Sequence, residues 1–192
     1  MCELNIYGDQ VGQTMHGNYT GKELEITSVS SVEIANDGKT VTTGSTQWVP
    51  FNRLNIRTDL VRVDVWHLVN NTQWVMVQSF EDSSSRGARS SWEPTVHFGS
   101  SIALSEDGYR LAIGAPGDDS AGVNSGSVFV YEQLVTGDWE LVGDPLFGIP
   151  GSEFGTSVAL SRDGNKLCVG APLSDRNGRE TGEVHLYQLT GV

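Results

Sequence analysis

The sequence predicts an all-β protein, a β-propeller or a propeller segment of about three four-stranded antiparallel blades. Three observations support this fold. The phrase FGSSIALSEDGYRLAIGAP at residues 98–116 returns fifty-six residues later, at 154–172, as FGTSVALSRDGNKLCVGAP. Small and apolar residues alternate along both copies with the period of two that is typical of strands. Asp-Gly pairs indicate tight hairpins, and 23 glycines in 192 residues indicate many turns.

Four strands are expected in the copy at 98–148. Residues 100–105 and 109–115 alternate on either side of an Asp-Gly bend. A polar loop then leads to SVFVYE at 127–132, and WELVGDPLF at 139–147 supplies the fourth strand. Short strands joined by turns in this order predict one antiparallel sheet.

Two further copies extend the pattern to a single domain over residues 1–192. The copy at 154–192 repeats the first three strands, and a degenerate copy lies at 18–80. The segment QVGQTMHG at 10–17 matches the fourth-strand segment LVGDPLFG. The chain thus opens on a fourth strand and ends after a third, so we expect the N-terminal strand to close the last blade, as in a ring of blades.

The two clear copies resemble a known repeat family. Phe98-Gly99 and Phe154-Gly155 are each followed by a Gly-Ala-Pro triplet, and this combination is similar to the FG-GAP repeat of the integrin alpha-chain β-propeller. The closer likeness is to calcium-free FG-GAP-like repeats with ALSxDG turns. It is strong from about residue 92 onward and weak before, where Ser28-Val29 replaces Phe-Gly. The resemblance implies a recognition or cell-adhesion module.

No metal or other cofactor is expected. Integrin-type repeats carry a calcium loop of the form Asp-x-Asp/Asn-x-Asp-Gly, whose oxygen atoms surround the ion. Here the corresponding turns have shrunk to SEDGYR and SRDGNK. Asp107 and Asp163 remain, but one carboxylate on a tight hairpin cannot supply six to eight oxygen ligands. We expect these two residues to shape the turns.

Polar residues after the Gly-Ala-Pro triplets are the first candidates for ligand binding. They are Asp118, Asp119 and Asn124 in one copy, with Asp175 and Asn177 in the next. Their similar spacing predicts that both groups emerge on one rim of the propeller. Clustered carboxylates and amides can bind a cation or a sugar. Ordinary solvent-exposed loops have the same composition, so both interpretations stay open.

The loop FEDSSSRGARSSWEP is the second candidate. Arg86 and Arg89 lie near Trp92 in an otherwise acidic chain. Trp and Arg are the residues most enriched in binding hot spots. Serine-rich tracts are also ordinary flexible insertions, so both interpretations stay open.

Catalytic motifs are not recognisable, and we predict no enzymatic activity. The four histidines, at 16, 67, 97 and 185, occupy four different positions of the repeat. Neither a Gly-x-Ser-x-Gly elbow nor a His-Glu-x-x-His motif occurs. An alternative is a hydrolase or lyase with its active site in the propeller funnel, since acidic residues are too plentiful for their spacing to be informative. A purely structural segment of a larger repeat array is a third interpretation.

The charge restricts the expected partners. With 12 basic and 24 acidic residues the formal net charge is −12, which disfavours nucleic acid. No apolar stretch approaches the length of a membrane span, so no membrane insertion is expected. We therefore expect a non-catalytic binding module that recognises a protein or carbohydrate partner through its rim loops.

Blade number and compartment are less defined. Three blades fall below the usual four to eight, so we expect either a segment of a larger ring or a homodimer that completes a six-bladed ring by exchanging residues 10–17. No signal peptide opens the sequence. An extracellular or cell-surface location would require a longer chain.

Overall fold

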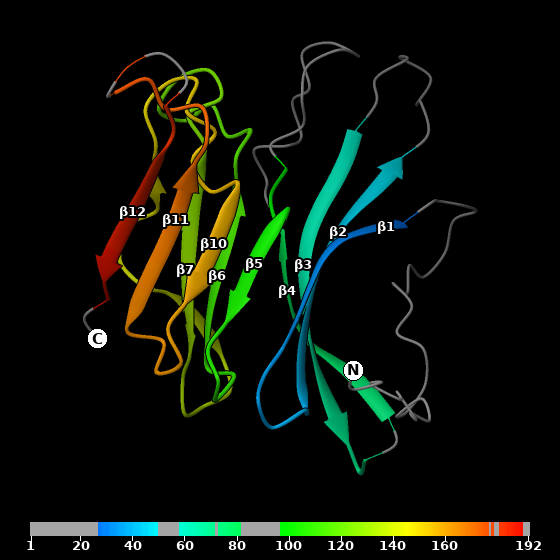
Figure 1. Ribbon diagram of the computed structural model, residues 1–192. Coiled ribbons are helices and arrows are strands. Elements are labelled where there is room, and N and C mark those ends of the chain that lie inside the picture. The colour runs from blue at the N-terminus through cyan, green and yellow to red at the C-terminus, as the bar shows by residue number, and fades with distance from the viewer. Residues whose placement is uncertain are drawn as a thin grey trace, which may run out of the picture.

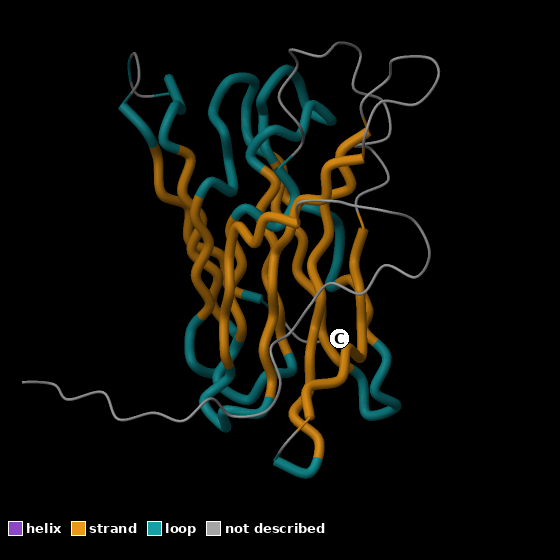
Figure 2. Tube along the Cα trace, turned by 90° about the vertical axis from the view of Figure 1, so that its right-hand side faces the viewer, coloured by secondary structure: helices purple, strands orange, loops and turns teal. Residues whose placement is uncertain are grey.

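The computed structural model describes residues 27–49, 58–71, 73–81, 97–176, 178 and 181–189. These residues form strands in three antiparallel sheets, and they include no helix. The sheets stand side by side with their strands running along one general direction (Figures 1 and 2). The predicted all-β fold is thereby confirmed, and the arrangement is that of successive blades of a propeller.

Each sheet corresponds to one blade. The first blade has the order β1 (Thr27–Ile34), β2 (Thr40–Val49), β3 (Thr58–Val69) and β4 (Gln73–Glu81). The second blade contains β5 (Ser101–Leu104), β6 (Arg110–Ala115), β7 (Ser127–Gln133), β8 (Trp139–Leu141) and β9 (Leu146–Phe147), the last two both pairing with β7. The third blade contains β10 (Ser157–Leu160), β11 (Lys166–Ala171) and β12 (Glu183–Gln188).

The outer edge of the third blade has no strand beside it among the described residues. Strand β12 pairs with β11 there, whereas the equivalent β7 of the second blade also pairs with β8 and β9. The N-terminal strand predicted to fill this place, at 10–17, lies outside the described residues.

The hairpins between the first two strands of the clear copies are built around their Asp-Gly pairs. Asp107 Oδ1 accepts a hydrogen bond from the Ser105 hydroxyl at 2.6 Å and another from the Tyr109 amide at 3.1 Å. Gly108 adopts a positive φ of 78°, which glycine tolerates without steric cost. The same bonds recur around Asp163 in the third blade. Both aspartates shape their turns, as the shortened loops led us to expect.

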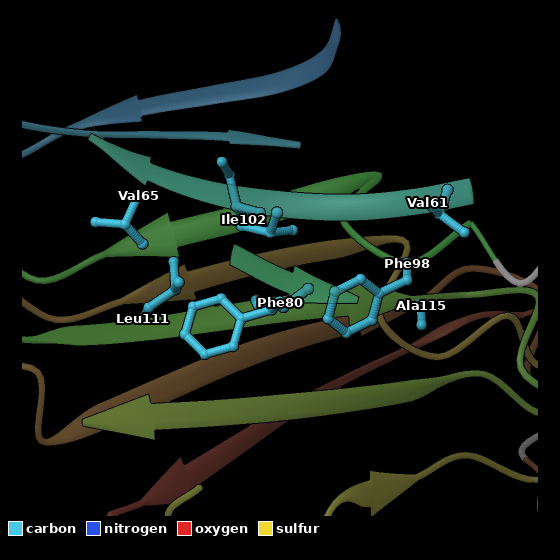
Figure 3. Packing of buried hydrophobic residues seen from close by; sticks show 9 residues of the cluster. Val61, Val65, Phe80, Phe98, Ile102, Leu111 and Ala115 are labelled. Carbon is cyan, nitrogen blue, oxygen red and sulfur yellow. The ribbon is translucent and has the colours of Figure 1, made fainter. Parts of the chain in front are cut away.

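Two apolar clusters lie between the blades because each strand presents alternate residues to opposite neighbours. Ile102 and Ile113 face the first blade, and the intervening Ala103 and Ala112 face the third. Figure 3 shows the first cluster. Its buried members are Val61, Val63, Val65, Phe80, Phe98, Ile102, Leu111, Ile113 and Ala115. The second cluster consists of Ala103, Ala112, Val128, Val130, Phe154, Leu167, Val169 and Ala171.

Candidate functional site

Two loops leave the second and third blades at the same end of the molecule. The first connects β6 to β7, and the second connects β11 to β12; both lie at the top of Figure 1. The hairpins around Asp107 and Asp163 lie at the opposite end, so this end carries the longer loops. We call the two connections, residues 116–126 and 172–182, the rim loops.

Asp118 faces inward and holds the first rim loop together. Its side chain is buried, with 4% of the residue exposed. One carboxylate oxygen accepts hydrogen bonds from the amide and the hydroxyl of Ser120, at 2.8 and 2.6 Å, and the other accepts the Ser127 hydroxyl at 2.6 Å. The Ser125 hydroxyl donates to the main-chain oxygen of Asp118 at 2.9 Å. Asp118 therefore positions the loop. From the loop composition we expected its carboxylate to point outward, whereas in the structure it points inward.

The outer part of the first rim loop presents an acidic and an apolar group to solvent. Asp119 is exposed, and its Oδ1 accepts the Asn124 amide at 2.7 Å. Asn124 is half-buried and has a positive φ of 49°. Between them, Val123 is 72% exposed. The loop therefore offers one carboxylate and one valine from a conformation that several hydrogen bonds define.

The second rim loop contains an equivalent hydrogen bond in which the positions of the hydroxyl donor and the carboxylate acceptor are exchanged. The Ser174 hydroxyl donates to Glu183 Oε2 at 2.9 Å, in the place where Asp118 accepts from Ser127. Asp175 is exposed next to this hydrogen bond. Aligning the two copies places Ser174 opposite Asp118 and Glu183 opposite Ser127, so this signal was present in the sequence although we did not interpret it.

Four predicted site residues cannot be placed. Asn177, Arg86, Arg89 and Trp92 lie outside the described residues. Of the predicted set, the structure thus brings Asp119, Asn124 and Asp175 to the same end of the molecule. In the described ranges, no group of three His, Cys, Asp or Glu side chains could hold a metal ion.

A pocket of about 450 Å³ opens on the face of the third blade that points away from the second. It is shallow, and Pro172, Thr181 and Gly182 of the second rim loop form part of its lining. Its lining residues are Thr156, Ser157, Gly170, Ala171, Pro172, Thr181, Gly182, Glu183 and Val184. Sequence reasoning did not identify this pocket, because the repeat motif is the same in both blades. On the second blade the corresponding space is filled by the third blade.

The family model of the FG-GAP repeat matches residues 93–131 and 148–187. Residues 93–131 and 148–187 are therefore FG-GAP repeats. The matched segments contain both Phe-Gly pairs, whose phenylalanines, Phe98 and Phe154, are 3% and 1% exposed and belong to the clusters between blades. The phenylalanine that begins each FG-GAP repeat thus packs into the junction with the preceding blade.

A solved structure with a similar fold is Kuenenia stuttgartiensis hydrazine synthase, at a TM-score of 0.50 and 13% sequence identity. The similarity covers 84% of this chain but 45% of that one. This chain therefore spans less than half the length of that protein, and the likeness concerns the fold alone. No curated protein matches the sequence. None of the described residues forms a helix long and apolar enough to cross a membrane.

Proposed function

We propose that this chain is a non-catalytic β-propeller module that binds a protein or carbohydrate partner through its rim loops. The observation that carries the proposal is the internal hydrogen bonding of the described parts of these loops through Asp118 and Ser174. Loops positioned by a rigid scaffold are the usual place of binding residues. A loop that is already ordered loses less conformational entropy when a partner binds.

The exposed groups indicate the kind of partner. Asp119 and Asp175 supply carboxylates, and Val123 supplies apolar surface close to the first of them. Together with the net charge of −12, they favour a partner that offers basic or hydroxyl donors beside an apolar patch. Both basic protein surfaces and sugars meet this description.

Matched variants test the proposal. The chain is screened against a glycan array and a displayed peptide library, and each ligand found is titrated against two variants. In the rim variant, Asp119→Ala, Val123→Ser and Asp175→Ala remove the exposed groups. In the control, Asp138→Ala and Val135→Ser make similar changes in the exposed turn at the other end of the second blade. The proposal requires at least tenfold weaker binding by the rim variant and unchanged binding by the control. Equal binding by both would refute it.

A further inference from the structure

The third blade begins with a Phe-Gly pair that is held by main-chain contacts on the second blade. The Phe154 amide donates to the Ser125 carbonyl at 3.1 Å, and Phe154 forms a parallel bridge with Gly126. The approach is so close that a Cβ atom on Gly126 would lie 2.1 Å from the Phe154 carbonyl oxygen. The second blade therefore has a defined seat for Phe154.

The neighbouring Gly155 also makes close contacts with the second blade. The Gly155 carbonyl oxygen accepts the Ser101 hydroxyl at 2.7 Å, and a Cβ atom on Gly114 would lie 2.2 Å from the same oxygen. Gly155 itself has a φ of 89°, a conformation that residues with a side chain rarely adopt. The seat thus requires small residues on the second blade and a glycine in the segment that it receives.

The junction between the first and second blades repeats these contacts. The Gly99 carbonyl oxygen accepts the Ser31 hydroxyl at 2.7 Å. A Cβ atom on Gly44 would lie 2.0 Å from that oxygen, and Gly99 also has a positive φ, of 78°. Two blades of this chain therefore hold a Phe-Gly pair in the same way.

The third blade retains the parts of this seat without an occupant among the described residues. In place of Ser101, Gly114, Gly126 and Val128 it has Ser157, Gly170, Gly182 and Val184. All four line the pocket of about 450 Å³. A Cβ atom on Gly170 would have Ser157 atoms as its three nearest neighbours, whereas one on Gly114 meets the carbonyl of the next blade.

The residues around the pocket are exposed, which also indicates that this face of the third blade lacks an occupant among the described residues. Val184 and Leu186 on β12 are 75% and 73% exposed, whereas their equivalents Val128 and Val130 on β7 are 0% and 4% exposed. Cys168 pairs with Leu186 across the sheet on this face and is half-buried. Apolar residues on this face therefore extend beyond the pocket along β12 and onto β11.

We propose that this face of the third blade binds a β-hairpin headed by a Phe-Gly pair and supplied by a second polypeptide. The phenylalanine would enter the pocket, and the glycine carbonyl would accept the Ser157 hydroxyl. A second copy of this chain fits less well, because its Phe98 and Phe154 are buried in its own junctions. Its first blade offers Ser28-Val29 in their place. The proposal does not rest on the exposed rim-loop groups Asp119, Val123 and Asp175, although Gly182 at the end of the second rim loop is part of the site.

The probe is a fluorescent peptide of residues 150–172 carrying Cys168→Ala, which contains the Phe-Gly pair and hairpin that dock on the second blade. Its binding to the full chain is measured by fluorescence anisotropy. The matched probe carries Phe154→Ala in addition. Val184→Asp places a charge on the proposed face at a position that is already exposed, and Val135→Asp does so in the distant turn, where the residue is fully exposed.

We expect at least tenfold weaker binding for the Phe154→Ala peptide and for the Val184→Asp chain, with Val135→Asp unchanged. In a Cys2→Ser background, saturating peptide should slow the reaction of Cys168 with a thiol reagent at least fivefold, because its equivalent Ala112 is fully covered by the next blade. Absent binding, or equal binding of both peptides or of both variants, would overturn the proposal. Dimerisation that protects Cys168 without peptide would do so too, since it would make a second copy the occupant.

Discussion

Replacing Phe154 by alanine tests whether the Phe-Gly pair holds neighbouring blades together. Phe154 is 1% exposed. Its ring contacts His185 edge-on with ring centroids 5.3 Å apart, and Tyr187 with centroids 6.4 Å apart. Its main chain is fixed on the second blade through Ser125, so the surrounding residues have little freedom to fill the space that alanine would leave.

The size of the effect follows from this burial. An aromatic side chain of this kind buries roughly 150–250 Å², which at about 25 cal/mol per Å² corresponds to about 4–6 kcal/mol as an upper bound. Core Phe→Ala replacements cost about 3–5 kcal/mol when the cavity cannot collapse. We therefore expect Phe154→Ala to lower the free energy of unfolding by about 4 kcal/mol.

Urea denaturation followed by tryptophan fluorescence and by circular dichroism measures this change. The dependence of the free energy on urea should stay constant, so that the shift in midpoint reports stability. Phe147→Ala is the control, because Phe147 lies on the short strand β9 and is 45% exposed; it should cost less than about 1.5 kcal/mol. A loss for Phe154→Ala no larger than that of the control would refute the role assigned to the Phe-Gly pair.

Two further predictions follow from the repeat. Gly114→Ala should destabilise the chain by about 1–3 kcal/mol in thermal or urea melts, because the added Cβ would lie 2.2 Å from the Gly155 carbonyl oxygen. Gly170→Ala should cost less, since the atom closest to its Cβ is a hydroxyl oxygen that can rotate away. Equal losses of stability in the two variants would contradict this reasoning. The Ser161 hydroxyl, followed by the amide of Asn165, lowers the pKa of Asp163 to about 2, so this carboxylate contributes stability above its unfolded value of 3.8 that is lost as pH falls toward 2. An NMR titration should find its pKa raised toward 3.8 in Ser161→Ala, and an unchanged pKa would count against the hydrogen bond as the cause.

The turns and the alternation of the strands could be predicted because they depend on neighbouring residues. Asp107 and Gly108 form a tight bend from their own hydrogen bonds and φ angle, which local chemistry dictates. The identical spacing of the Phe-Gly and Gly-Ala-Pro motifs likewise indicated repeated sheets. The direction of the Asp118 side chain was not predicted, because it depends on Ser127, which the loop brings back from nine residues away. Only the exchange of this pair for Ser174 and Glu183 in the next copy indicated the contact.

The sequence by itself determined that this protein is a series of antiparallel blades, because strand period and turn chemistry are local properties. The tertiary structure alone decided which faces of those blades are covered. Val128 and Val184 are the same residue at the same place in the repeat, yet the first is fully buried and the second is 75% exposed. Burial depends on which neighbour packs against a strand, and a repeated motif is the same whether or not a neighbour is present.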